Sequence, residues 1–142
     1  SGSGEQLNEL QNLVKKLGLH DQIVFTGKLN PDQIVQLYHS ADILLNPTTV
    51  DNMPNSLLEA MACGIPIITT DVGGIPYIVK DKETALFTPV DNPALMATQI
   101  CKLLASSELY NHLREQGLKE VKQYAWNEVK RQWLSIYSKY RK

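Results

Sequence analysis

Residues Asp42–Thr70 read DILLNPTTVDNMPNSLLEAMACGIPIITT, and this segment predicts the fold class. Its two ends, Asp42–Asn46 and Pro66–Thr70, are short and largely apolar, which is typical of strands buried on both faces. Between them, Asn55–Cys63 carries apolar residues at helical spacing, and the following Gly64 is a common helix-ending residue. A strand, a helix and a second strand in this order predict a parallel β-α-β unit.

The alternation of helices and strands continues on both sides of this stretch. Further strands are expected at Gln22–Thr26 and Ala85–Phe87. Further helices are expected at Leu7–Leu17, from Asn30-Pro31 onward, at Gly74–Val79, from Asn92-Pro93 to Leu104, at Glu108–Tyr124 and at Asn127–Lys139. No Asn-Gly or Asp-Gly dipeptide joins two strand-like runs, so hairpins are not expected. The sequence therefore predicts an α/β protein with a doubly wound parallel sheet.

Composition limits the size and the class of the protein. The chain has 142 residues, a length that fits one domain or part of a larger one. Its net charge of −1 argues against nucleic acid as a partner of the whole chain. The two cysteines, Cys63 and Cys101, cannot form a disulfide framework, and no run is apolar enough to span a bilayer. With no signal peptide at the start, we expect a cytoplasmic location. Residues 1–4 (SGSG) are interpreted as a cloning scar.

The loop that follows Asp42–Asn46 is the predicted ligand site, because open parallel sheets bind ligands beyond the carboxyl ends of their strands. Asp51 brings a carboxylate to this loop. The backbone N–H groups of Asn55, Ser56 and Leu57 would begin a helix and favour an anion. Glu59, one turn further on, can accept paired hydrogen bonds from ribose hydroxyls. These features predict a nucleoside diphosphate site; in the alternative interpretation, Asp51 only forms a turn and Glu59 only complements the helix dipole.

Three motifs in the chain are similar to those of one enzyme family. They are Phe25-Thr26-Gly27, then Asp51-x7-Glu59-Ala60-Met61-Ala62-Cys63-Gly64-x-Pro66, then Thr70-Asp71-Val72-Gly73-Gly74. Together they resemble the C-terminal domain of a family-4 (group 1) glycosyltransferase with the GT-B fold, over residues 7–140. The resemblance implies transfer of a sugar from a nucleotide-sugar donor to an acceptor, with retention of configuration and without a metal or cofactor.

The resemblance also implies roles for individual residues. Asp51 stands at the first acid of the family's Glu-x7-Glu motif, beside the donor sugar, and is the candidate catalytic residue. Glu59 is the second acid and would bind the ribose. The residues expected around the donor sugar and diphosphate are Asn52, Met53, Asn55, Ser56 and Leu57. Gly73-Gly74 either receives a ligand or forms a backbone turn.

Two departures from the family pattern fall in the same loop. Asp51 replaces the family's Glu, so its carboxylate is one methylene shorter. Pro54 takes a position often held by Gly and donates no N–H group. Two more departures, Tyr77 and Ala85, are interpreted as packing changes.

The family's C-terminal domain begins with a strand, a helix and a strand that precede the start of this chain, and these carry basic residues that neutralise the diphosphate. The N-terminal acceptor domain is absent as well. We therefore interpret residues 5–142 as a partial nucleotide-sugar-binding domain that is inactive alone. In the usual strand order, the absent strands would lie between Gln22–Thr26 and Asp42–Asn46. The expected outcome is a rearranged four-strand sheet or a homodimer formed by strand or helix exchange.

The C-terminal part of the chain combines aromatic and basic residues. From Lys119 onward, seven Lys or Arg stand against two Glu, a local net charge of +5 that leaves −6 for the remainder. Five aromatic residues lie here: Tyr124, Trp126, Trp133, Tyr137 and Tyr140. The predicted aromatic helix, residues 126–140, either packs on the sheet or on the missing domain, or contacts an anionic membrane peripherally.

Other functions on the same fold stay open. A sugar-nucleotide epimerase or a phosphorylase would share the fold, and a non-enzymatic assembly module would act through the exposed sheet and the aromatic helix. The favoured interpretation is a transferase of surface polysaccharide or glycolipid synthesis. The three histidines are not at metal-ligand spacing, so no metal site is expected; they are His20, His39 and His112.

Overall fold

A computed structural model describes residues 2–140 of the chain. The chain divides into two compact units, the first ending at Leu37 and the second beginning at Tyr38. In the first unit, α1 (Leu7–Lys16) is followed by an irregular segment and by the start of α2 (Pro31–Ser40). The start of α2 has the predicted capping box. The Gln33 N–H donates to Asn30 Oδ1 at 2.9 Å, and the Asn30 N–H donates to Gln33 Oε1 at 3.0 Å.

The predicted strand Gln22–Thr26 is wrong, because this segment has no regular secondary structure. A strand requires a neighbour that takes its backbone hydrogen bonds, and the described part of the first unit contains no other strand. The apolar side chains that suggested a buried strand are therefore exposed, Val24 to 80%. The apolar pattern indicates that these side chains favour burial. It does not indicate which surface, if any, buries them.

The second unit contains a parallel sheet of three strands in the order β1-β2-β3. These are β1 (Leu44–Asn46), β2 (Ile67–Thr70) and β3 (Ala85–Thr88). Leu44 pairs with Ile67, which pairs in turn with Ala85. The parallel α/β prediction is confirmed, whereas the rearranged four-strand sheet is wrong for the part of the chain described. Exchange between two copies stays a prediction.

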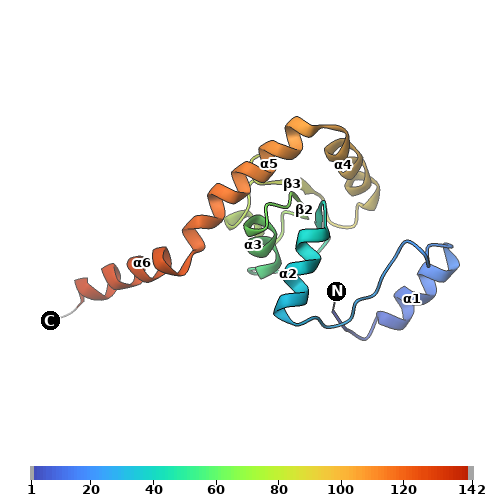
Figure 1. The fold of residues 1–142 in the computed structure, drawn as a ribbon, viewed down its shortest axis with the longest axis horizontal. Coiled ribbons are helices and arrows are strands. Elements are labelled where there is room, and N and C mark those ends of the chain that lie inside the picture. The colour runs from blue at the N-terminus through green and yellow to red at the C-terminus, as the bar shows by residue number, and fades with distance from the viewer. Residues whose placement is uncertain (1, 141–142) are drawn as a thin grey trace. The chain divides into compact units, whose positions relative to one another are not determined.

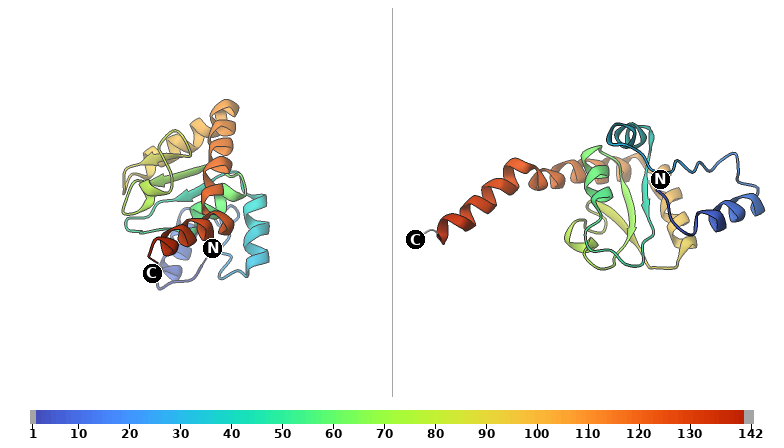
Figure 2. Two further views of the ribbon diagram at one scale, coloured as in Figure 1. Left: turned by 90° about the vertical axis from the view of Figure 1, so that its left-hand side faces the viewer. Right: turned by 90° about the horizontal axis from the view of Figure 1, so that it is seen from below.

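Helices cover both faces of this sheet (Figures 1 and 2). Successive residues of a strand point to opposite faces. Ile67 packs with α3 (Asn55–Ala62) in one buried cluster. Its neighbour Ile68 packs in a second cluster with Leu103 of α4 (Pro93–Ala105) and Leu113 of α5 (Ser107–Glu120). All four of these side chains are completely or almost completely buried.

Local signals place the ends of the remaining elements. The Asn92 side chain caps α4 by accepting from the Leu95 N–H at 3.0 Å. The helix predicted at Gly74–Val79 is a single 3₁₀ turn, η1 (Ile75–Tyr77). The helix predicted at Glu108–Tyr124 divides into α5 and the 3₁₀ turn η2 (Val121–Tyr124).

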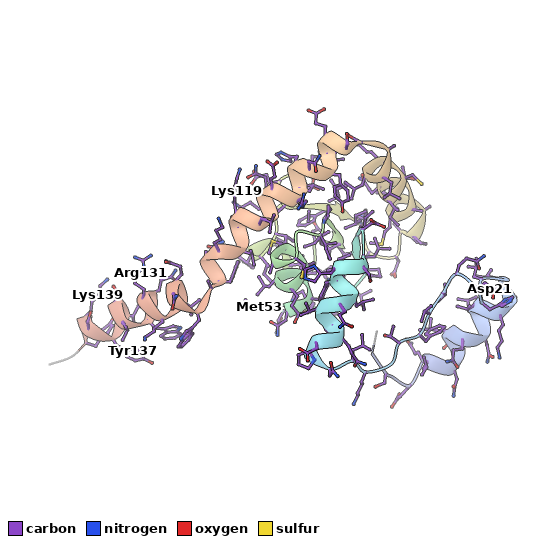
Figure 3. The ribbon with its side chains drawn as sticks, in the orientation of Figure 1. Asp21, Met53, Lys119, Arg131, Tyr137 and Lys139 are labelled. Atoms are coloured by element: carbon purple, nitrogen blue, oxygen red, sulfur yellow. The ribbon has the colours of Figure 1, made fainter. Side chains whose placement is uncertain are left out.

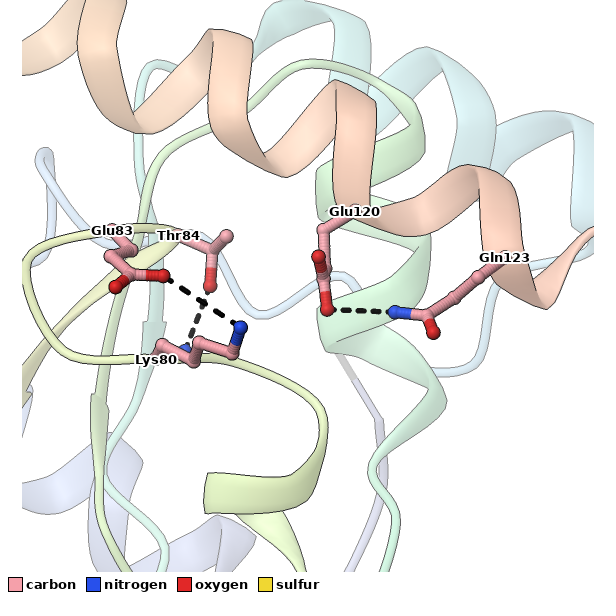
Figure 4. Close-up of polar contacts among 5 residues, drawn as sticks. All are labelled: Lys80, Glu83, Thr84, Glu120 and Gln123. Carbon is pink, nitrogen blue, oxygen red and sulfur yellow. Dashed lines mark hydrogen bonds and ion pairs between the residues drawn. The ribbon is translucent and has the colours of Figure 1, made fainter.

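Three short-range contacts lie close to the ends of these elements (Figure 4). In the turn before β3, the Lys80 N–H donates to Thr84 Oγ1 at 2.8 Å, and Lys80 Nζ lies 3.8 Å from Glu83 Oε2. At the start of η2, Gln123 Nε2 donates to Glu120 Oε1 at 2.7 Å. The bond to the buried Thr84 hydroxyl closes the turn, whereas the other two contacts join exposed side chains.

The aromatic helix α6 (Trp126–Lys139) contains no buried residue. Trp126 is 70% exposed and Tyr137 is 65% exposed, so the expectation that this face packs on the sheet is wrong. The Trp133 and Tyr137 rings stack with centroids 5.7 Å apart. Figure 3 shows Tyr137, Arg131 and Lys139 projecting from this helix. Within residues 2–140, no helix has the length and apolar character to cross a bilayer.

Candidate functional site

The loop between β1 and α3, residues 47–54, lies at the carboxyl end of the sheet and carries the predicted site. Two buried threonines at the end of β2 hold its first half. Thr69 Oγ1 donates to the Asn46 carbonyl at 3.1 Å, and Thr70 Oγ1 donates to the Thr48 carbonyl at 2.6 Å. These bonds satisfy both hydroxyls in the core, so the loop leaves the sheet along a defined path.

The second half of the loop rests on Gly73-Gly74. The Gly74 N–H donates to the Asp51 carbonyl at 3.0 Å. A Cβ atom on Gly73 would overlap the Asp51 carbonyl group, coming within 3.0 Å of its carbon. A Cβ atom on Gly74 would overlap the Asn52 carbonyl, coming within 2.7 Å of its carbon. The two glycines are therefore needed for the close approach of two backbones, which is the turn interpretation of this motif.

Asp51 turns its carboxylate back toward its own loop. Its Oδ1 accepts from the Met53 N–H at 3.2 Å, an arrangement typical of Asp in turns. The side chains that follow are open to solvent: Asn52 is exposed, and Met53 is 52% exposed and lies beside α3 (Figure 3). The structure thus places Asp51, Asn52 and Met53 on one accessible loop, and it shows a turn role for Asp51.

No side chain caps the start of α3. Pro54 occupies the N-cap position and has no hydrogen-bonding side chain, in contrast to Asn92 of α4. The Leu57 N–H donates to the Pro54 carbonyl at 3.1 Å, and the Leu57 side chain is fully buried. The first N–H groups of a helix have no intrahelical acceptor, so Asn55 and Ser56 supply the backbone donors that this end offers to an anion.

Glu59 lies on an exposed part of α3 and has a partner that the sequence did not predict. The Tyr38 hydroxyl, from the last turn of α2, donates to Glu59 Oε2 at 3.0 Å. The Ser56 carbonyl is 3.3 Å from the same hydroxyl. Tyr38 also packs against the buried cluster that contains α3. Burial, and then the bond to the Glu59 carboxylate, raise the pKa of Tyr38 well above its usual value.

Tyr38 escaped the sequence reasoning because it belongs to the apolar stripe of its helix. Ile34, Leu37 and Tyr38 are read as one packing face, and the phenol ring does pack. The only signal for a polar role was the hydroxyl itself, since a tyrosine at the edge of a core usually finds a hydrogen-bond partner.

A metal centre has no basis in the described residues. Between residues 2 and 140, no three His, Cys, Asp or Glu side chains gather in a way that could hold a metal ion. The arrangement instead combines backbone N–H donors and two carboxylates, Asp51 and Glu59. Such a set can receive an anionic group and hydroxyl groups.

The fold and the site together define a parallel α/β domain that offers a helix start and a carboxylate at the carboxyl end of its sheet. The sequence profile of the family described as "Glycosyl transferases group 1" matches residues 1–120. The chain belongs to this family. Its fold is that of the C-terminal domain of GT-B glycosyltransferases, as the resemblance implied.

Individual relatives agree with this assignment. The N-acetyl-alpha-D-glucosaminyl L-malate synthase of Bacillus anthracis is 32% identical over 137 residues, which cover 96% of this chain and 35% of that protein. Sucrose-phosphate synthase from Thermosynechococcus elongatus has a TM-score of 0.86 at 26% identity, covering 98% of this chain and 37% of that one. The C-terminal domain of a group 1 glycosyltransferase from Francisella tularensis has a TM-score of 0.75 at 26% identity, with coverages of 85% and 64%. The chain spans about a third of the length of the curated relatives it matches.

Proposed function

We propose that this chain supplies donor binding to a retaining glycosyltransferase, which moves a sugar from a nucleotide-sugar to an acceptor of the surface polysaccharide or glycolipid type. One observation carries the proposal. The chain is a member of the group 1 family, and its uncapped start of α3 lies one helical turn from the Glu59 carboxylate. Both lie at the carboxyl end of a parallel sheet.

Each group in the site has a chemical role in this proposal. The backbone N–H groups at Asn55–Leu57 favour the negatively charged diphosphate, with Asn55 and Ser56 the most available. Glu59 accepts hydrogen bonds from the ribose hydroxyls. Asn52 and Met53 lie beside the donor sugar, and Asp51 is the candidate catalytic residue. No step in this scheme uses a metal or a cofactor.

The isolated chain is expected to bind a donor without transferring its sugar. We propose that the acceptor-binding residues and the basic residues around the diphosphate belong to parts of longer relatives that this chain does not include. Transfer requires both substrates in one geometry, and that contribution would be missing here.

Calorimetric titration of the 142-residue chain with UDP, GDP and ADP tests the proposal. Replacing a charged hydrogen-bond acceptor costs about 1–3 kcal/mol, so Glu59→Ala should weaken binding of the preferred nucleotide by that amount. Glu115→Ala, which removes an exposed glutamate on α5, is the matched control and should leave affinity unchanged. Unchanged affinity in Glu59→Ala would show that Glu59 does not bind ribose.

The same titration separates the alternative functions. Failure of all three nucleotides to bind at millimolar concentration would favour a non-enzymatic assembly module. Assays of a full-length enzyme separate the transferase from the epimerase. Release of free nucleoside diphosphate only in the presence of an acceptor indicates a transferase, whereas an epimerase leaves the donor's diphosphate linkage intact.

Two partner proposals concern surfaces outside the nucleotide site. We propose that α6 contacts anionic membranes peripherally, because its exposed Trp126, Trp133 and Tyr137 accompany a local excess of basic residues. Co-sedimentation with vesicles should then require anionic lipid, and equal binding to neutral vesicles would refute the idea.

We also propose a homodimer formed by strand or helix exchange, which light scattering tests; a monomer at all concentrations would exclude it.

A further inference from the structure

We infer that Tyr38 is a positioning residue for donor binding: its hydroxyl holds one oxygen of the Glu59 carboxylate and leaves the other directed to the ribose. This inference rests on the proposed role of Glu59. It adds a residue from α2, which lies outside the loop and helix that the family motif covers.

The geometry selects Glu59 as the acceptor of the phenolic proton. The Tyr38 hydroxyl has one proton and two acceptors within reach. Glu59 Oε2 is at 3.0 Å and carries charge, whereas the Ser56 carbonyl is at 3.3 Å and is neutral. Hydrogen bonds to charged acceptors are shorter and stronger, so the proton lies toward Glu59.

The bond leaves the carboxylate able to bind a ligand. An ionised carboxylate accepts about four hydrogen bonds, and Tyr38 occupies one of them, on Oε2. Oε1 and the second lone pair of Oε2 have the capacity for two neighbouring hydroxyls, which is what a ribose presents. Tyr38 therefore supports Glu59 without competing for the whole group.

Positioning matters here because an exposed glutamate has several rotamers. Fixing such a side chain costs conformational entropy, and a ligand that binds a mobile carboxylate must offset that cost. The Tyr38 ring packs against the buried cluster around Leu57 and Met61, so its hydroxyl has a defined place. The pair thus orders Glu59 before the nucleotide arrives.

Tyr38 keeps its proton under all ordinary assay conditions. Burial and the neighbouring carboxylate both raise the pKa of its phenol, and both disfavour the phenolate. The hydroxyl is therefore a donor at neutral pH.

A double-mutant cycle on the 142-residue chain tests the inference. The proteins are the unchanged chain, Tyr38→Phe, Glu59→Ala and the double variant, each titrated with UDP, GDP and ADP and with the 2′,3′-dideoxy analogues. Tyr38→Phe should weaken binding of the ribonucleotides about two- to tenfold, the range of a single hydrogen bond. It should have no further effect once Glu59 is alanine, and none on the dideoxy analogues.

Tyr124→Phe is the matched control. Tyr124 also packs at the edge of the same buried cluster, but its hydroxyl donates to the Tyr77 carbonyl at 3.3 Å, away from Glu59. This variant should bind every nucleotide as the unchanged chain does. A purely structural role of the phenol would affect the ribonucleotides and their dideoxy analogues equally.

The outcomes distinguish this inference from the proposed function. If Glu59→Ala weakens ribonucleotide binding and Tyr38→Phe does not, the positioning role is wrong and the ribose role of Glu59 stands. An equal loss with the dideoxy analogues in Tyr38→Phe also overturns the positioning role. If Glu59→Ala binds all nucleotides normally, or if the unchanged chain binds none of them, the proposed function fails and the inference fails with it.

Discussion

Replacing Gly73 by alanine should destabilise the second unit and displace the loop that carries the candidate site. Gly73 has a φ of +56°, a backbone conformation that is unfavourable for residues with a Cβ atom. The same Cβ atom would also overlap the backbone carbonyl of Asp51. The Cβ atom is fixed to its own backbone and its partner is a backbone carbonyl, so neither can move aside by changing a rotamer.

The expected cost has two parts. The left-handed conformation costs an alanine about 1–2 kcal/mol. Forcing extra volume into a filled site costs about 1–3 kcal/mol more, because the neighbouring backbone must shift. The free energy of unfolding of Gly73→Ala should therefore fall by about 2–5 kcal/mol.

Gly64→Ala separates the two parts within the same unit. Gly64 follows α3 with a φ of +69°, so an alanine there suffers the same conformational strain. Its Cβ atom would meet the Arg114 side chain, with Nε at 3.2 Å, and a long exposed side chain can yield. Gly64→Ala should lose only about 1–2 kcal/mol. Urea unfolding of both variants, followed by circular dichroism, measures the difference.

The second readout is nucleotide affinity. Displacing Asp51 and Asn52 should weaken binding of UDP, GDP or ADP in Gly73→Ala and leave Gly64→Ala unaffected. Equal losses of stability in the two variants would contradict this prediction, because the backbone overlap would then contribute nothing. A stable Gly73→Ala with unchanged affinity would refute it as well.

Three further predictions concern other parts of the second unit. Asn92→Ala removes the cap of α4 and should lower the free energy of unfolding by about 1 kcal/mol in urea; a loss below a few tenths would show that the cap is not needed. The pKa of Tyr38 is raised from its ordinary 10.0 in the folded state, so the stability that the neutral phenol contributes is fully present below about pH 10 and declines above it. Urea midpoints should therefore fall more steeply above that pH for the unchanged chain than for Tyr38→Phe, and parallel curves would contradict the burial of the phenol. Trp133→Ala removes an exposed side chain of α6 and should change stability by less than about 0.5 kcal/mol, whereas a large loss would mean that α6 packs on another surface.

Local sequence signals predicted most of the secondary structure. The capping pair Asn30 and Gln33 and the cap Asn92 each use atoms within three residues of one another, so the chain alone identifies them. The prediction of a strand failed where strand formation depends on a neighbour elsewhere in the chain. Gln22–Thr26 has the composition of a strand, but a strand also needs a neighbour, and none is present in the described part of its unit.

The same distinction between local motifs and long-range contacts applies to the candidate site. The loop and helix that carry Asp51 and Glu59 were found from a motif contiguous in sequence, and the structure brings them to the carboxyl end of the sheet. Tyr38 was missed because it stands 21 positions before Glu59, and its hydroxyl reaches the carboxylate only because the ring packs against the cluster that contains α3. The sequence leaves two interpretations of Gly73-Gly74 open. The structure supports the turn interpretation, because added Cβ atoms there would overlap the carbonyl groups of residues 51 and 52.

The amino-acid sequence was sufficient to predict the family, the parallel α/β class and the segment that carries the candidate site. These depend on residue spacing and on short motifs, which survive without knowledge of the packing. Three outcomes required the packed fold: which side chains support the site, which expected strands form and whether the aromatic helix is covered. Those outcomes depend on contacts between segments far apart in the chain, where hydrogen-bond partners and buried surface are created by packing.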